Sequence, residues 1–224
     1  MNEIRFDIPR YLSTLPIFQE MNGAELSRLA EGCRLRTFGR GEAVFRVGMP
    51  CKEFHVAVNG QIKLFMISPT GQEKVIELVG PGMSFAEALM FMDKPYILNA
   101  QALTDAVVLT VGKDAVVGEV ERDPRLALRM LAGLSQRLHG LVRDVQAYAL
   151  HSGLERVVSY LLNALPGQSP DGTALDGNTE AAPPTGTHRV SLPVSKAAIA
   201  SRLSLTPEYF SRVLHELEAK GLIR

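Results

Sequence analysis

Apolar residues between Pro124 and Leu150 recur at alternating steps of three and four. This spacing is typical of a helix whose apolar seam meets a second helix. Asp123 can cap the helix, and Pro124 suits its first position because a backbone N–H would have no partner there. We therefore predict a dimerisation helix over residues 123–150, with packing against its own domain alone as the alternative. The predicted seam is Leu131, Leu134, Leu138, Leu141, Val145 and Tyr148.

Before this helix the apolar pattern has a period of two. Over residues 35–111, short apolar runs are separated by glycines, which predicts short antiparallel strands rather than alternating strands and helices. Short helices are expected within residues 9–31, where caps precede helical patterns. Residues 1–122 are therefore predicted to form one β-roll domain.

Two hairpins are expected inside this roll. The pair Asn59-Gly60 lies between apolar runs at residues 54–58 and 62–67, which is a strong sequence signal for a two-residue hairpin turn. A second hairpin is expected at residues 68–71, which read Ser-Pro-Thr-Gly.

Residues 151–224 return to helical patterns and are assigned to a second domain. Within it, residues 166–187 are rich in proline, glycine and small polar residues, so a mobile loop is expected there. A strand is expected at residues 189–192. Two helices follow, because Ser195 can cap the first and Thr206, with Pro207 behind it, can cap the second.

The second of these helices has two distinct faces. Phe210 and Val213 belong to an apolar stripe, so Glu208, Ser211 and Arg212 project to the other side. Arginine can bind guanine O6 and N7, and glutamate can accept from cytosine N4. The alternative is a plain surface ion pair between Glu208 and Arg212, four residues apart. The predicted DNA contacts are Glu208, Ser211, Arg212, Thr206, Lys196 and Arg202.

Charge and composition narrow the function classes. The chain of 224 residues has a formal net charge of zero, but residues 188–224 hold six Lys/Arg against three Asp/Glu, which suits a nucleic-acid partner. Its two cysteines do not make a disulfide framework, and the N-terminus lacks the pattern of a signal peptide. No apolar run approaches the roughly 20 residues that span a bilayer. We expect a cytoplasmic protein without membrane association, and no enzyme, since no catalytic motif is found.

Several motifs resemble one family. Residues 41–45, Gly-Glu-Ala-Val-Phe, and residues 81–88, Pro-Gly-Met-Ser-Phe-Ala-Glu-Ala, look like the cyclic-nucleotide-binding β-roll of the Crp/Fnr transcription regulators. Residues 208–212, Glu-Tyr-Phe-Ser-Arg, match the Glu-x-x-Ser-Arg signature of Fnr-like recognition helices. The resemblance implies an α+β chain with an N-terminal antiparallel β-roll, a long dimerisation helix and a C-terminal winged helix-turn-helix domain. In the family, the β wing would follow near Arg224.

The resemblance also implies partners. It suggests a homodimer that binds double-stranded DNA at a palindrome of the form TTGAT-N4-ATCAA, with RNA polymerase as a further partner and transcription activation as one outcome. Other hypotheses are a regulator of the same fold with a different small ligand, and a ligand-binding module without sequence-specific DNA binding.

The residues of the predicted sensor domain limit which signal ligand or cofactor it can bind. Family members that bind cyclic AMP use an Arg-Ser pair for the phosphate, and residues 95–99 here read Pro-Tyr-Ile-Leu-Asn, which argues against cyclic AMP. Two cysteines cannot ligate an iron–sulfur cluster of the type that oxygen-sensing members use. The predicted sensor pocket is formed by Phe85, Ala86, Glu87 and Tyr96.

Residues 85–95 and 134–139 resemble the Dnr-like branch, whose members respond to nitric oxide in denitrification. This resemblance makes haem the first candidate cofactor, although the identity of the cofactor is left open. His139 and His55 are the candidate metal ligands.

Overall fold

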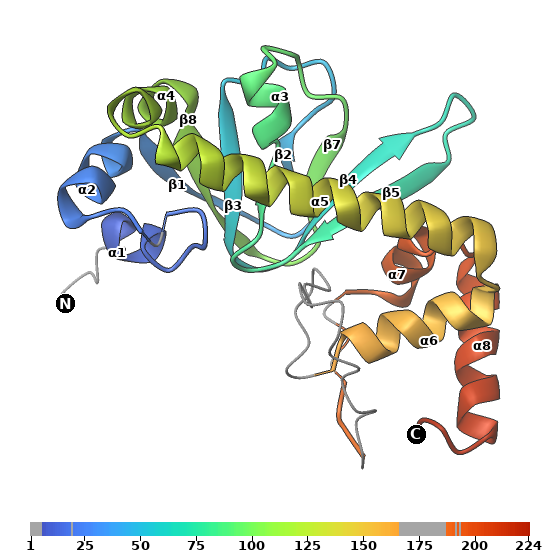
Figure 1. Cartoon of the computed structure of the whole chain (residues 1–224). Helices are drawn as coiled ribbons and strands as arrows, with labels where there is room; N and C mark the ends of the chain where they lie inside the picture. The colour runs from blue at the N-terminus through green and yellow to red at the C-terminus, as the bar shows by residue number, and fades with distance from the viewer. Residues whose placement is uncertain (1–5, 19, 166–186, 191, 193) are drawn as a thin grey trace, which may run out of the picture. The chain divides into compact units, whose positions relative to one another are not determined.

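The computed structural model describes residues 6–18, 20–165, 187–190, 192 and 194–224, without the side chains of Arg137, Ala147 and Tyr148. The chain forms two compact units, residues 1–134 and residues 135–224. Figure 1 follows the elements in chain order. The predicted mobile loop at 166–187 falls almost wholly outside the described residues.

The first unit is an antiparallel β-roll of two sheets. One sheet has the strand order β1-β8-β3-β6 and the other β2-β7-β4-β5. The strands of the first sheet are β1 (Cys33–Phe38), β3 (Glu53–Asn59), β6 (Ser84–Phe85) and β8 (Ala106–Gly112), and those of the second are β2 (Ala43–Phe45), β4 (Ile62–Ile67), β5 (Glu73–Val79) and β7 (Asn99–Ala102). The predicted β-roll is therefore confirmed.

The hairpin predicted at Asn59-Gly60 is wrong. Strand β3 pairs with β8 and β6, whereas β4 pairs with β5 and β7, so the turn carries the chain from one sheet to the other. A Cβ atom added to Gly60 would lie 2.4 Å from the carbonyl oxygen of Asp105, and Gly60 has a φ of +80°. Glycine is required at this corner because another backbone passes directly beside it. The hairpin at residues 68–71 is confirmed, since β4 and β5 pair directly.

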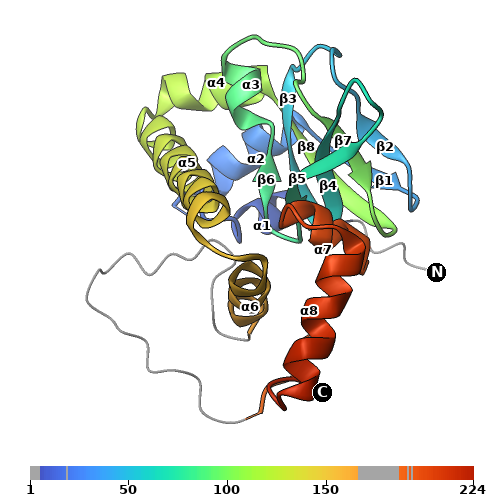
Figure 2. The same cartoon turned by 90° about the vertical axis from the view of Figure 1, so that its right-hand side faces the viewer.

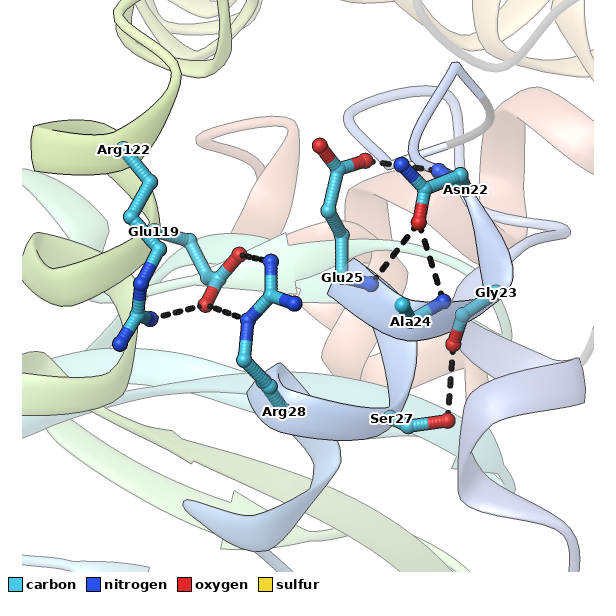
Figure 3. Close-up of polar contacts among 8 residues, drawn as sticks. All are labelled: Asn22, Gly23, Ala24, Glu25, Ser27, Arg28, Glu119 and Arg122. Carbon is cyan, nitrogen blue, oxygen red and sulfur yellow. Dashed lines mark hydrogen bonds and ion pairs between the residues drawn. The ribbon is translucent and has the colours of Figure 1, made fainter.

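Helices α1 (Ile8–Leu12), α2 (Gly23–Glu31) and α4 (Lys113–Arg122) lie together on one side of the strands (Figure 1), and α3 (Glu87–Phe91) follows β6. Asn22 caps α2, because its side-chain oxygen accepts from two backbone N–H groups while Glu25 accepts from the backbone of Asn22 (Figure 3). The Glu119 carboxylate on α4 binds the guanidinium groups of Arg28 on α2 and Arg122 at distances of 2.8 and 2.5 Å (Figure 3).

The long helix α5 (Arg125–Leu150) begins one residue after the predicted start, and the Asp123 carboxylate accepts from the backbone N–H of Arg125. Leu126 and Met130 are buried in the core of the first unit. Seam residues farther along α5 are exposed to solvent: the exposed fractions are 58% for Leu131, 64% for Leu138 and 65% for Val145. Leu134 is half-buried and the side chain of Tyr148 lies outside the described part. Within one chain, nothing among the described residues covers most of this apolar face.

The second unit contains α6 (Gly153–Asn163), α7 (Lys196–Arg202) and α8 (Pro207–Ala219). The apolar faces of these helices meet in one cluster, in which Val157, Ile199 and Phe210 are fully buried. The strand predicted at 189–192 is not found at 189, 190 or 192, and Ser191 lies outside the described residues. Among the described residues of this unit no strand occurs.

Candidate functional site

Helices α7 and α8 of the second unit follow each other through a tight turn (Figure 2). Ser195 caps α7 by accepting from the backbone N–H of Ala198, and Thr206 caps α8 by accepting from that of Tyr209 at 3.2 Å. Between them the chain passes through Ser204 with a φ of 56°, a conformation that usually favours glycine. The caps were read from the sequence, whereas this left-handed turn residue was missed because serine gives no signal for it.

Helix α8 presents a polar face opposite its core stripe. Phe210 and Val213 are buried, while Glu208 and Arg212 are exposed and Ser211 is half-buried. Such a face can enter a major groove without disturbing the core behind it. The structure therefore brings together the three residues that the sequence suggested for base contacts.

Arg212 is held by an aromatic ring. Its guanidinium carbon lies 4.7 Å from the centroid of the Tyr209 ring, a cation–π geometry. In the part of the chain that the structure describes, no ion pair joins Arg212 to Glu208, although both residues are placed. The simple surface ion pair is therefore not observed, and the guanidinium keeps its N–H donors for another acceptor.

The Tyr209 ring packs against the start of α6. A Cβ atom added to Gly153 would lie 2.5 Å from Cε1 of Tyr209, so only glycine allows this ring to approach the start of α6. Arg156 on α6 also donates to the carbonyl oxygen of Leu203, at 2.8 Å. Neither contact could be read from the sequence, because each joins residues that lie about 50 positions apart in the chain.

The remaining predicted DNA contacts differ in their surroundings. Lys196 and Thr206 are exposed at the starts of α7 and α8. Arg202 instead forms an ion pair with Asp144 of α5, and its side chain is only 20% exposed. A phosphate would have to compete with this carboxylate for Arg202.

In the first unit, Phe45 is the centre of an aromatic cluster. The Tyr96 ring lies parallel to it, with centroids 3.7 Å apart and an interplanar angle of 7°. The rings of His55 and Phe85 have centroids 5.3 and 5.9 Å from that of Phe45. Two of the four predicted sensor residues, Phe85 and Tyr96, thus meet in one cluster, whereas Phe45 was missed because an apolar strand residue carries no functional signal.

Ala86 and Glu87 directly follow Phe85 in the chain. Ala86 has a φ of 73°, in the left-handed region that costs a non-glycine residue about 1–2 kcal/mol. Its carbonyl oxygen accepts a weak bond from Sγ of Cys51 at 3.8 Å. Glu87 begins α3 and is buried. Cys51 and Cys33 are both free, and burial raises the pKa of Cys33 to about 12.

His55 is bound on both ring nitrogens. Nε2 lies 2.9 Å from the Tyr96 hydroxyl and Nδ1 lies 3.3 Å from Oγ1 of Thr110. Burial, with a smaller effect of the Arg36 charge, lowers the pKa of His55 to about 3. Both faces of β3 are buried, and Phe54 packs against Phe18 on the face opposite His55.

A small hollow opens beside this cluster. Its volume is about 180 Å³, and Tyr96 is the one predicted sensor residue that lines it. The lining residues are Arg36, Val44, Phe45, Met49, Pro50, Lys52, Glu53, His55 and Tyr96.

The haem that the Dnr-like resemblance suggests does not fit these residues. Pockets for drug-sized ligands measure about 300–1,000 Å³, and a haem needs at least that scale. Both nitrogens of His55 are already bonded, and His139 is an exposed residue of α5. Among the described residues, no group of three or more His, Cys, Asp or Glu side chains is placed to hold a metal ion.

Two family models match the chain. The cyclic nucleotide-binding domain matches residues 35–123, and the Crp-like helix-turn-helix domain matches residues 155–224. No helix among the described residues is long and apolar enough to cross a membrane.

Individual relatives agree with these models. The chain is 25% identical over 127 residues to the CRP-like cAMP-activated global transcriptional regulator of Mycobacterium tuberculosis, a match that covers 57% of each chain. It is 24% identical to the cyclic AMP receptor protein of Thermus thermophilus, over 93% of this chain and 88% of the relative.

Among solved structures, the crystal structure of DNR from Pseudomonas aeruginosa is 32% identical, with a TM-score of 0.52, over 95% of this chain and 87% of DNR. With both domain models matched in order and a relative of this similarity along nearly the whole chain, the protein belongs to the Crp/Fnr family of transcription regulators, with a helix-turn-helix DNA-binding domain.

Proposed function

We propose that the chain acts as a homodimeric regulator in which residues 1–122 sense a signal, residues 123–150 form the dimer contact and residues 151–224 bind DNA. The observation that carries this proposal is the polar face of α8, where Glu208 and Arg212 stand clear of a buried apolar stripe. A DNA partner would place the protein in the cytoplasm, and family membership supports RNA polymerase as a further partner.

The dimer contact rests on α5. Its predicted seam leaves Leu131, Leu138, Leu141 and Val145 exposed in the single chain. Burying a leucine side chain contributes about 1.5–3 kcal/mol, so pairing this face with a second copy is strongly favourable. A two-fold dimer would present two α8 helices to major grooves about 34–36 Å apart, which requires a palindromic site.

Within each half-site, Arg212 would bind a guanine through O6 and N7, and Glu208 would accept from a cytosine N4. The base sequence of the proposed palindrome, TTGAT-N4-ATCAA, follows from the Glu-x-x-Ser-Arg match to Fnr-like recognition helices. Lys196 and Thr206 would contact phosphates.

The Dnr-like resemblance favours nitric oxide acting through haem, but the residues around the hollow do not fit a haem. The absence of a cation at residues 95–99 likewise argues against cyclic AMP. We propose a signal ligand smaller than either.

A gel-shift titration with the palindrome and with a scrambled duplex tests the DNA-binding function. Arg212→Ala should weaken binding to the palindrome by about 1–3 kcal/mol and relax the preference at the guanine. Lys196→Ala is the matched control, since loss of a phosphate contact weakens both duplexes and lowers the salt dependence. Equal affinity of the unaltered protein for both duplexes would favour a ligand-binding module without sequence-specific DNA binding.

A further inference from the structure

The hollow beside the aromatic cluster combines an apolar wall with charged groups. Val44, Phe45, Met49 and Pro50 supply apolar surface, and Tyr96 closes one side with its ring stacked on Phe45. His55 adds a neutral polar edge, bonded to Tyr96. Flat apolar surfaces of this kind favour a planar, apolar ligand body.

Three charged side chains belong to the same lining. Arg36 and Lys52 carry positive charge and Glu53 carries negative charge. The two cations less the one carboxylate leave one positive charge, which suits a ligand with a single negative charge. Glu53 would repel a ligand with more than one negative charge.

Arg36 is an exposed residue of β1 that lines the hollow. Its guanidinium carbon lies 4.8 Å from the ring centroid of Phe38, which fixes the side chain over an aromatic face. The positive charge of Arg36 also contributes to lowering the pKa of His55. Its field therefore extends to the polar groups of the aromatic cluster, where an anion would be stabilised.

We propose that this hollow binds a small aromatic monocarboxylate, with its ring against Phe45 and Met49 and its carboxylate bound by Arg36 and Lys52. The volume of about 180 Å³ admits a single ring with one carboxylate and is too small for a nucleotide or a haem. Its action as the signal of a DNA-binding regulator rests on the proposed function, whereas binding itself needs no DNA.

Isothermal titration of the full chain with benzoate tests the site, and benzamide provides a neutral ligand of the same shape. Benzoate should bind with one molecule per chain, and benzamide at least ten-fold more weakly. Arg36→Gln should weaken benzoate at least ten-fold. Arg34→Gln is the matched control, because Arg34 lies on the same strand but does not line the hollow, and it should change affinity less than two-fold.

Lys52→Gln provides a second variant in case Arg36→Gln disturbs the packing on Phe38, and it should weaken benzoate as well. No measurable binding of benzoate, equal binding of benzamide, or equal effects of the changes at Arg34 and Arg36 would overturn the site. Gel shifts with and without benzoate then separate the two proposals: benzoate binding without any DNA shift contradicts the proposed function alone, and a specific DNA shift without benzoate binding contradicts the site alone.

Discussion

His55 is a titratable side chain kept neutral inside the first unit. Its pKa of about 3 lies below the ordinary value of 6.5, so the unfolded chain binds a proton between these values while the folded chain does not. Stability should therefore fall as the pH drops below 6.5, by about 1.4 kcal/mol per pH unit. Denaturant unfolding at pH 7 and pH 5 should show a loss about 2 kcal/mol larger in the unaltered protein than in His55→Gln. Equal losses would contradict a neutral, buried His55.

Tyr209 lies under Arg212 and against Gly153, so its ring should position the guanidinium rather than touch DNA itself. Tyr209→Leu should reduce the affinity ratio between the palindrome and a scrambled duplex by about two- to five-fold, since cation–π contacts contribute roughly 0.5–1 kcal/mol at exposed sites. Tyr209→Phe keeps the ring and should leave the ratio unchanged. If both variants behave like the unaltered protein in gel shifts, Arg212 does not depend on the ring.

At the scale of elements, Glu119 ties α4 to α2. The two arginines, first of all Arg28, hold the pKa of Glu119 below its ordinary value of 4.5. Glu119→Gln should lower the free energy of unfolding at pH 7 by about 1–2 kcal/mol, a modest value because Arg28 and Arg122 remain partly exposed to water.

A carboxylate with a lowered pKa stabilises the fold above its unfolded pKa and loses this contribution as the pH falls through the folded value. The difference between Glu119→Gln and the unaltered protein should therefore shrink below pH 4.5. Glu121→Gln, an exposed neighbour on the same helix, is the control and should have little effect at either pH. A constant difference across this range would contradict the role of the ionised carboxylate.

At the scale of the whole molecule, we propose that the exposed seam of α5 forms the dimer contact. Leu138→Glu places a charge at the centre of the proposed contact, and each chain would lose about 1.5–3 kcal/mol of leucine burial in addition to the cost of burying the charge. Sedimentation velocity should show monomers at concentrations where the unaltered protein is dimeric.

Gln136→Glu adds the same charge on the outer face of α5, where residue 136 is exposed, and should leave the dimer intact. If Leu138→Glu remains dimeric with unchanged affinity, the contact lies elsewhere. A monomeric Leu138→Glu variant should also lose most of its affinity for the palindrome, because each half-site would be bound alone.

Much of this molecule follows from local signals. The starts of α2, α6, α7 and α8 coincide with capping side chains, because a cap acts over three or four residues of the same chain. The hairpin at residues 68–71 and the polar face of α8 are local for the same reason, since they depend on turn chemistry and on helical period.

Contacts between segments that are distant in the sequence could not be predicted from such local signals. Asn59-Gly60 reads as a hairpin turn, yet the passage of Asp105 beside Gly60 and the pairing of β3 with β8 make it a corner between sheets. Arg202 reads as a free cation, yet α5 brings Asp144 to it.

The candidate sites divide in the same way. The polar face of α8 could be found from the chain alone, because its residues are neighbours on one helix. The aromatic cluster, the neutral state of His55 and the cation of Arg36 beside it depend on strands separated by many residues in the chain. Burial and electrostatic field are properties of the packed assembly, and no short stretch of residues specifies them.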